Sequence, residues 1–217
     1  MFDSRNLAKV YMEKKDRSGV DKYYEKALAL SREIGDPKEL CLDLRSLGNL
    51  YMDRGYREKA ERYFLESFEI SKQGGDKREL SEDYRNRGNL SFSNGFRDKA
   101  EEHYMEALRL TLEVGDQFGA AKDYAYLGNL KFKGGKFDDA EEMFEKTAKI
   151  FSDTKSLVNL VQLYMTVAKM NLTESRKDPC KLYLEKATQL AAELGNPEHL
   201  MRSIEELQKM REAIDRI

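Results

Sequence analysis

The sequence predicts an all-α protein, a right-handed α-solenoid of five helix-turn-helix repeats. Three observations lead to this prediction: similar segments recur every 40 residues, apolar residues keep fixed columns, and glycines recur where each helix should end. The clearest copies are Leu47–Leu50, Arg87–Leu90 and Leu127–Leu130. A fixed period of this size is typical of a solenoid, in which each repeat packs only against its neighbours.

The period predicts one continuous array over residues 1–217, with a pair of helices in each repeat. The expected repeats are 1–35, 36–75, 76–115, 116–153 and 154–195, and a capping helix is expected at 197–215. This gives about 11 helices. Terminal repeats of solenoids are usually atypical because they close the stack.

The core is predicted from columns of residues that keep their size from repeat to repeat. The first helix carries a tiny column: Ala8, Gly48, Gly88, Gly128 and Ala168. The second helix carries a small column (Val20, Ala60, Ala100, Ala140, Cys180) and a large one (Tyr24, Phe64, Tyr104, Phe144, Leu184). Two further columns follow: Ala27, Ser67, Ala107, Thr147, Ala187, and then Leu30, Ile70, Leu110, Ile150, Leu190. A tiny residue lets a neighbouring helix approach closely, and the large side chain fills the space beside it.

Turns are predicted from glycine and aspartate. Gly55, Gly95 and Gly135 separate the two helices of a repeat, because glycine readily takes the positive φ found at helix C-termini. Between repeats, a glycine ends one helix and the next residue caps the following one, as in Gly35-Asp36, Gly75-Asp76, Gly115-Asp116 and Gly195-Asn196. Glu39 and Glu79 stand three residues after their caps, as in a capping box. The fourth junction, 151–154, lacks the pair, so a differently shaped linker is expected there.

These signals set the expected helix bounds in the middle repeats. The first helices are predicted at Lys38–Arg54, Lys77–Asn94 and Gln117–Gly134. The second helices are predicted at Arg57–Gln73, Arg97–Val114 and Phe137–Ser152.

Composition favours a cytoplasmic protein that binds neither nucleic acid nor the interior of a membrane. Charged residues make up 36% of the chain, yet the net charge is only -2, so both signs are interspersed on solvated faces. No apolar stretch is long enough to span a bilayer. The N-terminus does not read as a signal peptide, and two cysteines do not form the disulfide pattern of a secreted chain.

The columns resemble the tetratricopeptide repeat. In the second repeat the family's pattern of small, aromatic, turn glycine, small and aromatic residues falls on Gly48, Tyr51, Gly55, Ala60 and Phe64. The usual period of that family is about 34 residues. The longer repeat with Leu-Gly-Asn signatures resembles the LGN/Pins adaptors and the kinesin light chains. The resemblance implies that the first helix of each repeat lines a concave groove, which binds an extended peptide of a partner protein.

Two polar columns of the first helix are not needed for the core. One is Asn49, Asn89 and Asn129, ended by Lys9 and Lys169; the other is Arg5, Arg45 and Arg85, four residues earlier. In one interpretation the amides bond neighbouring helices or water and the arginines are a solvated face. In the preferred one the amides bond a peptide main chain, and the arginines pair carboxylates, as does Lys122. The preferred interpretation predicts a partner peptide that contains Glu or Asp.

Two other patterns compete for the same surface. The carboxylate clamp of the chaperone-binding members of the family would fall on Arg45, Asn49, Asn86, Lys122 and Tyr126, where only Tyr126 fails to match in kind. A column of Met12, Met52, Phe92 and Phe132 is predicted to pack between helices rather than to anchor a peptide. The groove is therefore expected to include Asn86 together with the arginine and asparagine columns.

No catalytic or metal-binding pattern is present, and no cofactor is expected. His103 and His199 are distant in the array and have no cysteine at metal-ligand spacing. Cys180 stands in the small core column, where an inert thiol is expected. The sequence therefore predicts a monomeric, non-enzymatic adaptor. The alternatives are a self-associating structural solenoid and a regulatory subunit of an enzyme.

Overall fold

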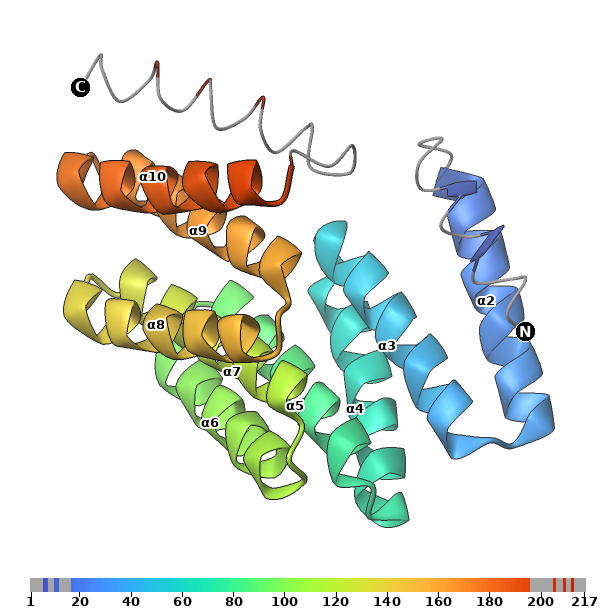
Figure 1. The fold of residues 1–217 in the computed structure, drawn as a ribbon. Coiled ribbons are helices and arrows are strands. Elements are labelled where there is room, and N and C mark those ends of the chain that lie inside the picture. The colour runs from blue at the N-terminus through green and yellow to red at the C-terminus, as the bar shows by residue number, and fades with distance from the viewer. Residues whose placement is uncertain are drawn as a thin grey trace. The chain divides into compact units, whose positions relative to one another are not determined.

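The structure is a computed structural model that describes residues 17–195 and seven separate residues near the two ends: Asn6, Leu7, Val10, Tyr11, Glu205, Lys209 and Glu212. Residues 17–195 contain nine helices and no strand (Figure 1). Their bounds are α2 (Arg17–Ile34), α3 (Pro37–Asp53), α4 (Arg57–Gly74), α5 (Lys77–Ser93), α6 (Arg97–Glu113), α7 (Gln117–Lys133), α8 (Phe137–Asp153), α9 (Leu157–Thr173) and α10 (Lys177–Glu193).

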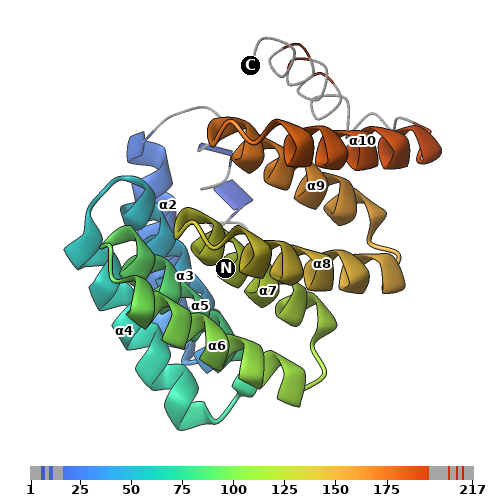
Figure 2. The same ribbon diagram turned by 90° about the vertical axis from the view of Figure 1, so that its left-hand side faces the viewer.

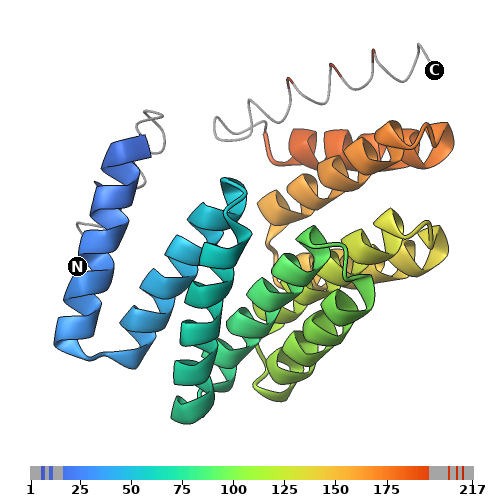
Figure 3. The ribbon, with the colours of Figure 1, turned by 180° about the vertical axis from the view of Figure 1, so that it is seen from behind.

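Internal contacts divide the chain into two compact units, Met1–Leu130 and Lys131–Ile217. In the first unit α3 packs against α4, α4 against α5, and α5 against α6 (Figure 2). In the second unit α8 packs against α9 and α9 against α10 (Figure 3). The continuity of the array over 1–217 concerns how the two units join, and it stays a prediction.

The all-α class and the helix bounds of the middle repeats are confirmed. Each bound predicted for α3 to α8 lies within one residue of the observed end. Of two of the roughly 11 predicted helices, the first helix of repeat 1 and the capping helix at 197–215, the structure describes only separate residues. Below, the first and second helices of a repeat are called the A and B helices; α3, α5, α7 and α9 are A helices.

The predicted core columns of the B helices are buried. Ala60, Ala100, Ala140 and Cys180 are fully buried, and the large column beside them is nearly so. The last column differs, because only Leu110 is buried while Leu30, Ile70, Ile150 and Leu190 are partly exposed.

The tiny column works as predicted. A Cβ on Gly88 would lie 2.4 Å from the Tyr104 ring, and one on Gly48 would lie 2.3 Å from the Phe64 ring. These contacts are shorter than any that side chains tolerate, so the aromatic ring of the B helix occupies the space a methyl group would need.

Glycines end the helices in left-handed conformations, as expected. Gly55, Gly95 and Gly135 have φ values of 79°, 83° and 76° between the A and B helices. Positive φ is unfavourable for residues with a Cβ. At two later turns another residue replaces the glycine. Lys155 and Ser175 nonetheless keep the left-handed conformation there, each with a φ of 54°.

The expectation of a differently shaped fourth junction is wrong. The amides of Lys155 and Ser156 donate to the carbonyl oxygens of Ser152 and Phe151, in the same pattern as the equivalent amides of the third junction. The reason is that the last carbonyl groups of a helix need hydrogen-bond donors, and a turn of this shape supplies them. Lys155 therefore adopts the left-handed conformation despite its backbone strain.

The Asp caps are confirmed, but the capping box is not completed by Glu79. The Asp36 and Asp76 carboxylates accept from backbone amides two and three residues later. The carboxylate of Glu79 instead accepts a hydrogen bond from Arg45 of the preceding repeat. At the fourth junction Ser156 caps α9 without a side-chain hydrogen bond.

Candidate functional site

Arg45 is buried between the second and third repeats. Only 8% of the residue is exposed, and its guanidinium donates to the Glu79 carboxylate at 2.5 Å and to the Glu79 carbonyl oxygen at 3.3 Å. It also lies 3.5 Å from the Asp83 carboxylate. The second repeat is thereby joined to the third by a charged group that has little contact with solvent.

Asp83 is fully buried and collects hydroxyl donors as well. Ser67 and Ser71 of the B helix α4 donate to its two carboxylate oxygens at 2.5 Å and 2.6 Å. Because two hydroxyls and a guanidinium surround the carboxylate, its hydrogen-bonding capacity is met inside the protein.

The next junction repeats the arrangement. Arg85 is 3% exposed, its Nε donates to the Asp123 carboxylate at 2.6 Å, and its Nη1 lies 2.5 Å from the Glu82 carboxylate. Thr111 of α6 donates to the second oxygen of Asp123 at 3.0 Å. We call Arg45–Asp83 and Arg85–Asp123 the inter-repeat ion pairs.

Burial and pairing shift the pKa values in these clusters. Burial alone would lower the pKa of Arg45 and Arg85, but the neighbouring carboxylates outweigh it and raise both, so the guanidinium groups stay charged. Burial also raises the pKa of Asp83 and Asp123, although the arginines and hydroxyls oppose that shift. The raised pKa values reflect that the Asp83 and Asp123 carboxylates are shielded from water.

Sequence reasoning missed the aspartate column, although the signal was available. Asp43, Asp83 and Asp123 recur at the 40-residue period, and each follows an arginine of the preceding repeat by 38 residues. A charged residue at this period, seven residues before the buried leucines Leu50, Leu90 and Leu130 of the A helices, would have indicated a buried partner for the arginines.

The arginine column thus differs from both interpretations of the sequence. Arg45 and Arg85 are neither a solvated face nor free cations, because carboxylates of the chain itself engage them. A partner's carboxylate would reach them only in competition with Glu79, Asp83, Glu82 or Asp123. Their direct contact with a partner stays a prediction, and Arg5 lies outside the described residues.

The asparagine column is more accessible. Asn49 is exposed, and Asn89 and Asn129 are partly exposed. The Tyr104 hydroxyl donates to the Asn89 amide oxygen at 2.7 Å, which leaves the amide nitrogen of Asn89 as a donor. Phe64 and Phe144 stand at the position of Tyr104 in the neighbouring repeats and carry no hydroxyl.

The remaining predicted residues have mixed surroundings. Lys122 lies over the Phe118 ring and 3.8 Å from the Glu82 carboxylate. Asn86 is 8% exposed, and Tyr126 stacks on Tyr104 with ring centroids 5.3 Å apart. Lys169 is exposed in the second unit.

In the first unit, helical spacing puts the asparagine column on one face of the A helices, in a row with the residues three and seven positions before each asparagine. The rows are Leu42, Ser46 and Asn49 on α3; Glu82, Asn86 and Asn89 on α5; and Lys122, Tyr126 and Asn129 on α7. We call this set the A-helix face. Its side chains offer amides, hydroxyls and one exposed leucine, and its charged groups are Glu82 and Lys122.

This geometry argues against the interpretation of these residues as a carboxylate clamp. Of its five positions, Arg45 is held by Glu79 and Asp83, and Lys122 lies near Glu82. The Met and Phe column is partly confirmed as packing: Phe132 is buried and meets Phe137 edge-on, whereas Met52 and Phe92 are half-buried.

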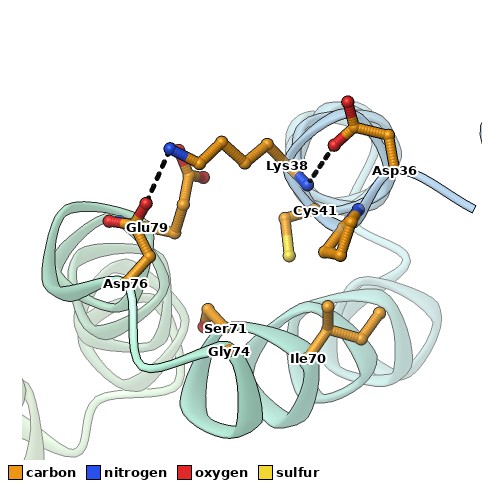
Figure 4. A pocket seen from close by; sticks show the side chains of 9 residues that line it. Asp36, Lys38, Cys41, Ile70, Ser71, Gly74, Asp76 and Glu79 are labelled. Carbon is orange, nitrogen blue, oxygen red and sulfur yellow. Dashed lines mark hydrogen bonds and ion pairs between the residues drawn. The ribbon is translucent and has the colours of Figure 1, made fainter.

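A separate pocket of about 270 Å³ opens where the second and third repeats join (Figure 4). At the rim of the pocket the Lys38 ammonium forms an ion pair with Asp76 at 2.8 Å, and the Cys41 thiol lines the pocket below them. Burial raises the pKa of the Cys41 thiol, which disfavours the reactive thiolate. Within the described residues no cluster of side chains could hold a metal ion, and no helix is long and apolar enough to cross a membrane.

The fold and the A-helix face define a helical-hairpin repeat protein. Two models described as tetratricopeptide repeat match the chain, one over residues 82–153 and the other over 5–38 and 44–78. These ranges together cover more than half of the sequence. The chain belongs to the tetratricopeptide repeat family, whose members generally mediate protein–protein interaction.

Solved structures share the fold at low sequence identity. BtubC (BKLC) from P. vanneervenii has 20% identity and a TM-score of 0.71, over 90% of this chain and 81% of that one. A second structure contains TPR-like repeats, nearly identical to one another, of a Podosopora anserina protein described as a kinesin light chain. It has 13% identity and a TM-score of 0.66, over 90% of this chain and 96% of that one.

A third similar structure is a Rap protein complexed with Competence and Sporulation Factor. It has 16% identity and a TM-score of 0.67, and the match covers 98% of this chain and 64% of the Rap chain. These likenesses support the fold. Comparison by sequence with curated proteins finds no match.

Proposed function

We propose that the chain is an adaptor that binds an extended segment of a partner protein along the A-helix face. The observation that carries the proposal is the asparagine column, because Asn49, Asn89 and Asn129 recur at one position of successive A helices and remain accessible. Close packing of the helices is served by the neighbouring glycines Gly48 and Gly88 rather than by the amides. Among the three amides, that of Asn89 also accepts a hydrogen bond from Tyr104 of α6.

An asparagine column suits a peptide main chain. The amide offers a donor and an acceptor, which match the carbonyl and N–H groups that an extended peptide presents along its length. By the resemblance to the kinesin light chains and the LGN/Pins adaptors, such a segment would lie in a concave groove lined by the A helices. The Rap structure, solved with a bound factor, supports binding by this fold in general.

The preference for an acidic segment belongs to the same proposal and rests on cations of the A helices. The exposed Lys169 of the second unit would carry it. In the first unit Lys122, Arg45 and Arg85 would contribute only in competition with carboxylates of the chain. We further propose a monomer in the cytoplasm, which the interspersed charges and the two free, buried cysteines support.

The proposal is tested by affinity capture with mass spectrometry, comparing the wild type with Asn49→Ala/Asn89→Ala/Asn129→Ala. Asn94→Ala is the matched control, because Asn94 is exposed in a turn outside the A-helix face. A partner should be lost only from the triple variant, while its helical content stays unchanged. Equal capture by the triple variant would contradict the proposal, and concentration-dependent sedimentation of the chain alone would favour the self-associating alternative.

A further inference from the structure

The A-helix face carries little net charge once the inter-repeat ion pairs are taken into account. Arg45 and Arg85 are 8% and 3% exposed, and each meets two carboxylates of the chain. The two cations that the sequence directed toward a partner are therefore already compensated in the folded protein.

The remaining charges of the face also compensate each other. Glu82 is half-exposed, lies against Arg85 and is 3.8 Å from the Lys122 ammonium. Its pKa lies below the ordinary value even though burial opposes that shift, because Arg85 and Lys122 stabilise the ionised form.

A further carboxylate at this surface would be poorly placed. The three cations Arg45, Arg85 and Lys122 already lie beside four carboxylates, those of Glu79, Glu82, Asp83 and Asp123. Bringing another negative charge near buried aspartates adds like-charge repulsion and takes the incoming group out of water. A basic segment would lack a free carboxylate here, because Glu82 is paired and Asp83 and Asp123 are fully buried.

We infer that the first unit selects an uncharged segment of its partner, bound through main-chain hydrogen bonds to the asparagine column, with an apolar side chain placed on Leu42. Leu42 is 43% exposed at the edge of the face and supplies that contact. The inter-repeat ion pairs are positioning groups, which fix the spacing of the three A helices and do not touch the partner. This inference rests on the proposed peptide binding and narrows its partner class, replacing charge pairing in this unit.

A displayed library of random peptides tests the inference without a known partner. Peptides of about ten residues span three neighbouring helices that lie about 10 Å apart. Selection on the full chain should enrich sequences with few charged residues and a recurrent apolar position. Enrichment of Asp and Glu that persists in a Lys169→Ala variant would overturn the inference, whereas failure of any peptide to enrich would overturn the proposed function itself.

The affinity of a selected peptide should depend weakly on salt. Raising the salt concentration from about 0.05 M to about 0.5 M should change Kd by less than about twofold, because screening acts on charges and not on amide hydrogen bonds. A weakening of tenfold or more would show that charge pairing carries the binding. Asn49→Ala/Asn129→Ala should lose about tenfold in affinity, with Asn94→Ala as the control, and unchanged binding by the pair variant would refute the asparagine contact.

The role of the arginines is separated by Arg85→Met/Asp123→Leu, which replaces one ion pair with apolar side chains. Such replacements are often neutral for stability, so the variant should fold. Its Kd for the selected peptide should stay within about threefold of the wild type. A tenfold loss in the folded variant, together with a strong salt dependence of wild-type binding, would mean that Arg85 contacts the peptide. If the variant does not fold, the salt dependence of the wild type decides the question.

Discussion

The junctions between repeats are built in two ways. At the second and third junctions a buried aspartate of one A helix receives an arginine and at least one hydroxyl from the preceding repeat. At the fourth junction the positions of Thr111 and Asp123 are taken by Phe151 and Leu163, and both are buried. One period therefore accommodates both a charged and an apolar interface.

The comparison teaches where polar residues are costly to change. Apolar contacts at the fourth junction depend on shape and area, so they tolerate exchange of similar side chains. A buried ion pair depends on both partners, because loss of one leaves the other charged and desolvated. The same substitution thus has different consequences at equivalent positions.

The largest effect is expected for Asp83→Ala. The change removes the acceptor of the Ser67 and Ser71 hydroxyls and one partner of Arg45, and should reduce the free energy of unfolding by about 3–5 kcal/mol. Urea unfolding followed by circular dichroism measures it. Asp53→Ala, at an exposed position, is the control and should change stability by less than about 0.5 kcal/mol. Equal losses in the two variants would mean that the pair is not needed.

Gly88→Ala should cost about 1–3 kcal/mol, because the new methyl group would clash with Tyr104. The fifth repeat suggests the remedy, since it pairs Ala168 with the smaller Leu184. In a Tyr104→Leu background the added cost of Gly88→Ala should therefore fall below about 1 kcal/mol. Thermal unfolding of the four proteins in this cycle gives the coupling, and strict additivity would show that the glycine has another role.

Substitutions at the left-handed residue of a junction should change the free energy of unfolding by smaller amounts, with opposite signs at the fourth and third junctions. Lys155→Gly should stabilise the chain by about 0.5–1 kcal/mol, because it removes the strain of φ 54°. Gly115→Ala should destabilise it by about 1 kcal/mol, since φ is 68° there. Denaturation midpoints measure both, and a loss of stability in Lys155→Gly would show that the lysine side chain matters more than its backbone.

The helix caps should differ least. Asp116 accepts a hydrogen bond from the Gly119 amide at 2.9 Å, so Asp116→Ala should cost about 1 kcal/mol. Ser156 caps α9 without such a bond, and Ser156→Ala should change stability by less than about 0.5 kcal/mol. If the two losses measured by urea unfolding were equal, capping would not distinguish the junctions.

The repeat period was sufficient to predict the helices, the glycine turns and the buried columns, because these depend on residue size and backbone conformation within one repeat. The shape of the fourth junction was not predictable from the absence of Gly-Asp, since hydrogen bonds at a helix end can force Lys155 into the left-handed region. Composition marks preferred residues for a turn but does not exclude others.

The candidate site was only partly predictable. The asparagines were placed on an accessible face of the A helices, as the Leu-Gly-Asn pattern suggested. The arginines were assigned to the same surface because helical spacing gives a side chain's direction but not its partner in the next repeat. Arg85 and Asp123 stand 38 residues apart, and only the stacking of α5 and α7 brings them within 2.6 Å.

The most direct test of the charged junction is a double-mutant cycle of Arg85→Met and Asp123→Leu, measured by urea unfolding. Each single variant should lose about 3 kcal/mol, because the remaining charge stays buried without its partner. The double variant should be no less stable than either single one, since it gives the third junction the apolar character of the fourth. Losses that simply add in the double variant would contradict an ion pair that holds the repeats together.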